Sequence, residues 1–161
     1  MISKGSLDEK KVIMIDKALG DYITAVTIQE IRPDYAAYHL HQAVEKILKA
    51  GLLSFDPELD VSVYQHDVTS LSRTFSKYAG LSEEFRLKCA EVDEIAPSIR
   101  YTNSRNDIGQ GEIRTMLIAA ESIIKESSNV AKVKPFFDEA IHKTVDENLK
   151  CLKPILDRES Q

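Results

Sequence analysis

Hydrophobic residues recur along most of this chain every three or four positions, which is the spacing of one face of an α-helix. The first such segment opens with a capping box, in which Ser6 is placed to cap the helix and Glu9 to reach back to it. Gly20 marks a place where this helix is expected to kink or break, and Pro33 is suited to the entry of the next helix. The apolar positions of the segment are Val12, Ile15, Leu19, Tyr22, Ile23 and Val26.

The same criteria predict five further helices, separated by short polar turns. Their expected ranges are 34–53, Asp67 to Gly80, Ser82 to about Pro97, 112–127 and 135–153. The residues 54–65 and 102–111 have the composition of loops, and the brief alternation near Val63 is too short for a strand. The pattern therefore predicts an all-α fold, an antiparallel up-and-down bundle of about five to six helices.

Composition supports one helical domain over residues 1–161. Hydrophobic residues make up 43% and charged residues 29%, and the chain has only six glycines and five prolines. Few turn-forming residues argue against a β-sandwich or barrel, and no repeat or linker divides the sequence. The net charge of −5 excludes an overall basic field for nucleic acid or anionic lipid, although it leaves room for a local basic patch.

Several features predict a cytoplasmic protein without a membrane span. The longest apolar runs, such as Met116 to Ala120, have five residues, which is far too short to cross a bilayer. Asp8 and Asp16 lie where an export signal would need its apolar core. Cys89 and Cys151 lie far apart with no paired spacing, and we interpret them as reduced thiols.

The expected helix over 34–53 carries a polar face with several interpretations. Gln42, Lys46 and Lys49 share one face, since they lie at positions i, i+4 and i+7, and Glu45 forms an i, i+4 pair with Lys49. The face can be a solvated surface with such pairs. Alternatively, the two lysines meet phosphates while Gln42 and a histidine bind a base or ribose. In a third interpretation, Glu45 pairs with Arg100 across helices.

Two dipeptides outside that helix are also candidates. Asp67 is a preferred residue for capping the helix that follows it, which leaves His66 to satisfy a hydrogen bond in the loop. Arg100 follows Pro97 at an expected helix end, where it can close a polar pocket or bind an anion. Tyr101 is interpreted as a packing residue with its hydroxyl at the rim.

Three segments taken in order resemble the HEPN family, which is named for nucleotide binding in higher eukaryotes and prokaryotes. They are Tyr38 to Ala50, containing Gln-Ala-Val-Glu-Lys-Ile-Leu-Lys-Ala; His66 to Leu71, opening with His-Asp-Val; and Ile99-Arg100-Tyr101. The resemblance covers residues 21–105 well and the fifth helix loosely, with the C-terminal helix 135–153 outside it.

The resemblance implies a small bundle that often forms a homodimer and is often encoded with a minimal nucleotidyltransferase, as a two-component or toxin–antitoxin pair. In such a module Lys46, Lys49 and Arg100 would supply cations for a nucleotide or RNA. The complete set of expected ligand-binding residues is Gln42, Glu45, Lys46, Lys49, His66, Asp67, Arg100 and Tyr101.

Sequence motifs for catalysis and for cofactors are not found. Many HEPN ribonucleases have an arginine and a histidine separated by four to six residues, late in the bundle. The only comparable pair here, Arg32 and His39, spans Pro33 at the wrong end of the bundle. His39 and His41 lie two residues apart, and so point to different helix faces, unlike a helical metal pair. Gly109-Gln110-Gly111 lacks the strand and third glycine of a dinucleotide site, and no cofactor is expected.

The sequence therefore predicts a HEPN-like module that binds a nucleotide or nucleic acid without catalysis. One alternative is an atypical, metal-independent endoribonuclease that uses His39 or His66. Another is a pure protein-interaction module in which Glu45 and Arg100 are buried against each other. The apolar surface of the expected C-terminal helix suits either packing on the bundle or binding a partner.

Overall fold

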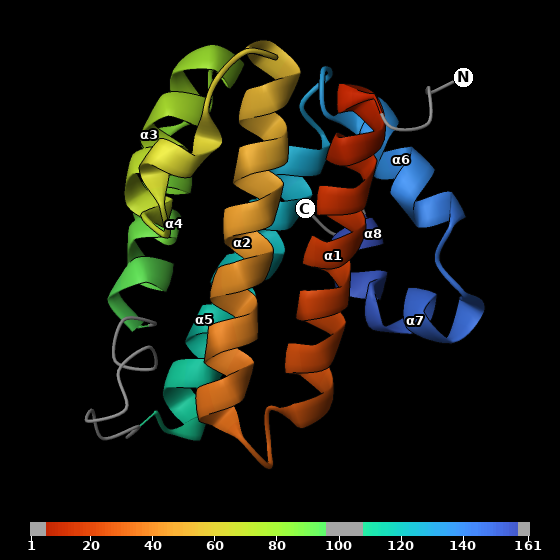
Figure 1. The fold of residues 1–161 in the computed structure, drawn as a ribbon. Coiled ribbons are helices and arrows are strands. Elements are labelled where there is room, and N and C mark those ends of the chain that lie inside the picture. Colours follow the sequence, from red (N-terminus) through yellow and green to blue (C-terminus); the bar gives the residue numbers. More distant parts are fainter. Residues whose placement is uncertain (1–5, 96–107, 158–161) are drawn as a thin grey trace.

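A computed structural model describes residues 6–95 and 108–157, and the regular structure of this part is entirely helical. The all-α fold is thus confirmed (Figure 1). The described helices are α1 (Leu7–Ile28), α2 (Pro33–Phe55), the 3-10 helix η1 (Val61–Tyr64), α3 (Val68–Ala79), α4 (Glu83–Ile95), α5 (Gln110–Ser128), α6 (Lys134–His142), α7 (Asp146–Cys151) and α8 (Lys153–Leu156).

The helix ends of the first half follow the sequence signals. The side chain of Ser6 accepts a hydrogen bond from the backbone N–H of Glu9, as expected for the cap of α1. Pro33 lies in the first turn of α2, where its missing N–H costs nothing. Gly80 ends α3 in the left-handed conformation, with φ of 68°. Gly20 neither kinks nor breaks α1, which runs continuously through it.

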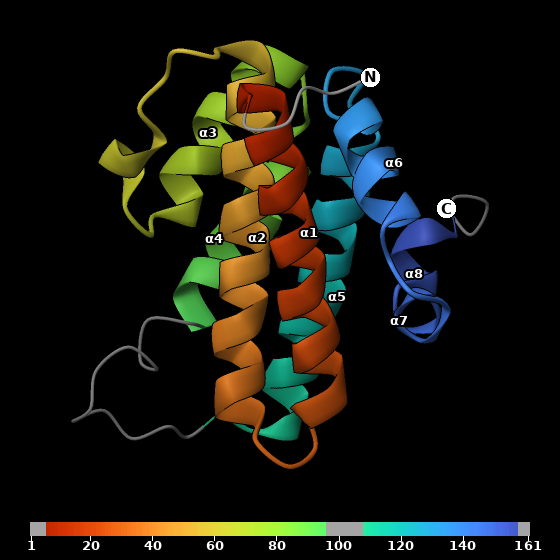
Figure 2. The ribbon, with the colours of Figure 1, turned by 45° about the vertical axis from the view of Figure 1, so that its right-hand side comes forward.

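Helix α2 is the centre of the bundle, and α1, α3, α4 and α5 all pack against it (Figures 1 and 2). Its apolar stripe is completely buried, and small residues lie between the large ones, so that neighbouring helices approach closely. The closest approach is at Gly51, where a Cβ atom would lie 2.6 Å from the ring of Phe75 on α3. This central position makes the polar residues of α2 a meeting point for the other helices.

The chain alternates direction between α1 and α2 and between α3 and α4, but not between α2 and α3. Residues 56–67, which include η1, return along α2 before α3 begins (Figure 1). As a result Glu45, in the middle of α2, contacts His66 just before α3, while Phe55 and Tyr78 stack where these two helices end. The returning segment therefore brings the start of α3 against the middle of α2.

The predicted continuous helix over 135–153 is wrong, because the structure divides this region into α6, α7 and α8. Helix α6 ends at His142, the backbone N–H groups of Lys143 and Thr144 donate to carbonyls three residues earlier, and Val145 is extended with ψ of 152°. Val145 continues the apolar spacing by coincidence, since it is 63% exposed. Pro154 lies in the first turn of α8. Phe137 and Ile155 are nevertheless buried, so the region packs on the bundle.

Candidate functional site

A buried carboxylate, Glu45, is the centre of a polar site between α2 and the start of α3. Its side chain is only 7% exposed. The Lys49 ammonium donates to Oε2 of Glu45 at 2.9 Å, and Nδ1 of His66 lies 2.9 Å from Oε1. Lys49 also donates to the backbone carbonyl of Gln65 at 2.9 Å. Glu45 and Lys49 thus hold Gln65 and His66, the two residues before the Asp67 cap of α3.

A second carboxylate, Asp93 on α4, joins this site to a third helix. Nε2 of His41 lies 2.8 Å from Oδ1 of Asp93, and the other ring nitrogen is 3.9 Å from Glu45. The remaining oxygen, Oδ2, accepts from the backbone N–H and the hydroxyl of Thr69, both at 2.7 Å. We call the five residues Glu45, Lys49, His66, His41 and Asp93 the polar cluster. It connects α2, α3 and α4 through hydrogen bonds.

Both carboxyls of the polar cluster stay ionised near neutral pH. Burial by itself would raise the pKa of Glu45, but the hydrogen bonds from His66 and Lys49 outweigh it, so the pKa lies below its ordinary value. Burial likewise opposes ionisation of Asp93, and the hydrogen bonds from His41 and Thr69 again lower the pKa. The cluster therefore contains two ionised carboxylates that are hydrogen-bonded by one lysine and two imidazoles.

His66 is the member of the polar cluster most accessible to a ligand. Its side chain is 57% exposed, whereas that of His41 is 2% exposed. Nδ1 is held by Glu45, and no other part of the described chain hydrogen-bonds its Nε2. An imidazole held at one nitrogen by a buried carboxylate, with the other nitrogen facing solvent, can donate a hydrogen bond or transfer a proton.

The backbone that presents His66 is strained. Gln65 has φ of 51° and ψ of −114°, and it is the only described residue other than glycine with positive φ. This conformation is one that glycine adopts readily and other residues avoid. The Lys49 hydrogen bond to the Gln65 carbonyl helps to hold it. Such strain is often concentrated at functional sites, because there the geometry of a side chain matters more than local stability.

The structure separates Lys46 from the polar cluster. The Lys46 ammonium pairs with Asp21 on α1, and Nδ1 of His39 lies 2.9 Å from the same carboxylate. Although Lys46 and Lys49 lie three residues apart on α2, Lys46 pairs with α1, whereas Lys49 bonds to Glu45 on its own helix and to the Gln65 carbonyl before α3, so the two do not form one pair of cations. Gln42 is half-buried on α2.

The remaining predicted site residues have different outcomes. Asp67 caps α3, accepting from the backbone N–H and hydroxyl of Ser70 at 2.9 and 2.7 Å, which confirms its interpretation as a helix cap. The imidazole of His66 bonds to Glu45 on α2, and not within its own loop as predicted. Arg100 and Tyr101 lie outside the described residues, so the suggested pairing of Glu45 with Arg100 stays a prediction.

Sequence reasoning missed Asp93 altogether and considered His41 only as a metal ligand. Asp93 is one of several acids on α4, and nothing in its spacing distinguishes it from them. His41 did carry a signal, because it precedes Val44 and Leu48 by three and seven positions and so lies on the buried stripe of α2. A polar residue at a core position needs a buried partner, and here that partner is Asp93.

Within residues 6–95 and 108–157, no group of three or more histidine, cysteine or acidic side chains is arranged to hold a metal ion. None of the helices in this part of the chain combines the length and apolarity needed to span a bilayer.

The fold and the polar cluster define a helical-bundle domain with a buried acid–imidazole site between its second, third and fourth helices. The model of one family, the HEPN domain, matches residues 13–130. This match covers most of the chain and extends on both sides of the 21–105 resemblance, so the chain belongs to the HEPN family. No curated protein matches the chain, and no solved structure does so either.

Proposed function

We propose that this HEPN domain binds the phosphate of a nucleotide or RNA at His66 and Lys49. The observation that carries the proposal is the exposed imidazole of His66, held by buried Glu45 on the strained backbone of Gln65, beside the Lys49 ammonium. A ligand phosphate would accept from Nε2 of His66 and from Lys49.

The other predicted ligand residues have supporting roles in this proposal. Gln42 lies one turn before Glu45 on α2 and is suited to a base or ribose. Lys46 would contribute by leaving its ion pair with Asp21 to contact the ligand, or by adding positive potential near it. Arg100 and Tyr101 stay predictions from the family resemblance, and Asp67 acts by fixing the start of α3.

The proposal is tested by measuring the affinity of a panel of nucleotides and short RNAs by calorimetry. Lys49→Ala and His66→Gln should each weaken binding about tenfold or more, while circular dichroism shows an unchanged helical fold. Lys134→Ala is the matched control, since it removes one lysine that pairs with Asp138 on α6. Affinities unchanged by the first two variants would refute the site.

A second candidate function is metal-independent cleavage of RNA, because the pairing of His66 with Glu45 resembles that of a general base with its orienting carboxylate. Purified protein would be incubated with end-labelled RNA in excess chelator. Cleavage that is lost in His66→Gln but kept in Lys134→Ala would support an enzyme. RNA that stays intact would contradict the enzyme and leave binding as the single proposed function of this site.

We further propose that the domain forms a homodimer in the cytoplasm and partners a minimal nucleotidyltransferase in a two-component or toxin–antitoxin pair. Family membership supports this proposal. Light scattering of the purified chain would give its oligomeric state. A pure interaction module, the remaining alternative, predicts normal assembly together with no nucleotide or RNA binding in the calorimetry.

A further inference from the structure

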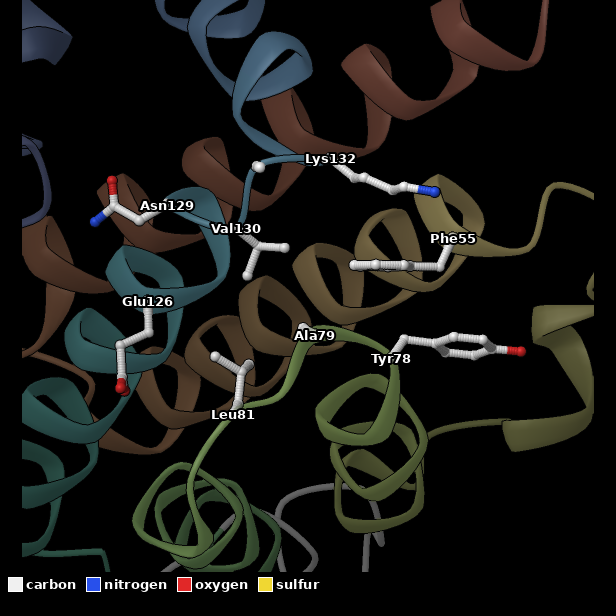
Figure 3. A pocket seen from close by; sticks show the side chains of 9 residues that line it. Phe55, Tyr78, Ala79, Leu81, Glu126, Asn129, Val130 and Lys132 are labelled. Carbon is white, nitrogen blue, oxygen red and sulfur yellow. The ribbon is translucent and has the colours of Figure 1, made fainter.

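A groove of about 490 Å³ lies where α2, α3 and α5 end, away from the polar cluster (Figure 3). The stacked rings of Phe55 and Tyr78 form one wall, with their centroids 5.5 Å apart. Glu126 and Asn129, at the end of α5, lie on the other side. Leu81, Val130 and two alanines provide an apolar lining between them. The volume is typical of a site for a small molecule.

The electrostatics of the groove favour a cation. The helical residues that line it all belong to the last turns of α2, α3 and α5, where the negative ends of the helix dipoles lie. The carboxylate of Glu126 adds a full negative charge. The structure already contains an ammonium in this environment, because Nζ of Lys132 lies 5.3 Å from the centroid of the Phe55 ring.

The Glu126 carboxylate has only weak partners within the described chain. The Ser122 hydroxyl donates to it at 3.4 Å, and the nearest cation is the ammonium of Lys88 at 3.9 Å. Lys88 also donates to Ser122 at the shorter distance of 2.8 Å. With 32% of its side chain exposed, Glu126 can accept a stronger, charge-assisted hydrogen bond from a ligand in the groove.

We propose that this groove binds a small organic ammonium ion with an aromatic or similarly apolar body. The apolar body packs on Phe55, Leu81 and Val130, and the ammonium pairs with Glu126. Lys132 is exposed and flexible, so it moves aside and competes electrostatically with the ligand. This site is separate from the polar cluster and does not depend on phosphate binding there.

The test uses two probes with the same ring and opposite charges, 2-phenylethylamine and 3-phenylpropionate, in NMR titrations of the ¹⁵N-labelled protein. The amine should shift the backbone amides around Glu126 to Lys132 and bind at least about tenfold more tightly than the acid. Equal affinities, or tighter binding of the acid, would overturn the proposal. Shifts confined to other parts of the protein would overturn it as well.

Three variants sharpen the result. Glu126→Gln keeps the shape of the side chain and should weaken the amine about tenfold, whereas Glu94→Gln, an equal charge change in the last turn of α4, should leave it unchanged. Lys132→Gln should strengthen amine binding a few-fold, because it removes a competing charge. Loss of amine binding in Lys132→Gln would contradict the cation assignment.

A lysine side chain from another protein offers the same ammonium chemistry as a free amine. Nα-acetyl-lysine methylamide, titrated in parallel, distinguishes the two sources. Weaker binding than 2-phenylethylamine supports a free ligand with an aromatic body. Binding of the lysine derivative without binding of the aromatic amine would overturn the small-molecule assignment.

Discussion

Replacing Gln65 by glycine should make the protein more stable, which is the reverse of the usual effect of glycine. The Gln65 backbone, at φ 51° and ψ −114°, is a conformation that costs a non-glycine residue about 1–3 kcal/mol. Glycine removes this strain but gives the unfolded chain more freedom, which costs about 0.5–1 kcal/mol. The side chain of Gln65 is exposed and contributes little to packing. The net gain is therefore about 1 kcal/mol.

The measurement is urea and thermal unfolding of Gln65→Gly, with Gln65→Ala as the matched control that shortens the side chain and keeps the strain. A gain of about 1 kcal/mol in a domain of this size raises the melting temperature by roughly 2–4 °C. The alanine variant should unfold like the parent within about 0.5 kcal/mol. A glycine variant less stable than the alanine variant would show that the backbone at this position is not strained.

Two further groups of measurements test the core and the polar cluster. Gly51→Ala should destabilise the protein by about 1–3 kcal/mol, since the new methyl would lie 2.6 Å from the buried Phe75 ring. Gly20→Ala, with open space around it, should stabilise the protein by about 0.5–1 kcal/mol. Similar unfolding curves for the two variants would contradict this packing. The lowered pKa values of Glu45 and Asp93 contribute stability that is present above about pH 4.5 and lost as the pH falls through the folded values. Urea unfolding from pH 6 to about pH 3 should show a shallower loss in Glu45→Gln than in the parent.

The helices of the bundle could be predicted because their signals are local. Caps such as Ser6 and Asp67, the left-handed Gly80 and the stripe on α2 act within one or two helical turns. The C-terminal prediction failed for the same reason. The apolar spacing there continues across Val145, but that residue is extended and mostly exposed, so the local pattern does not correspond to a helix.

The polar cluster could be predicted only in part, because its members come together through the tertiary fold. Glu45 and Lys49 are an i, i+4 pair that the sequence displays directly, and His66 was identified through the family resemblance. Asp93 lies 52 residues from His41, and no local rule connects them. The sharing of a face by Lys46 and Lys49 was also misleading, since Lys46 pairs with Asp21 on α1 and Lys49 with Glu45 on α2 itself.

The returning segment 56–67 separates the packing of the helices from the placement of a polar side chain at the site. In a bundle of simple hairpins, a change in the length of a loop alters how two helices are placed against each other. Here the segment lies on the outside of α2, and its last residues determine where His66 meets Glu45. Insertions and deletions within it can therefore reposition the imidazole along α2 while the buried stripe stays the same.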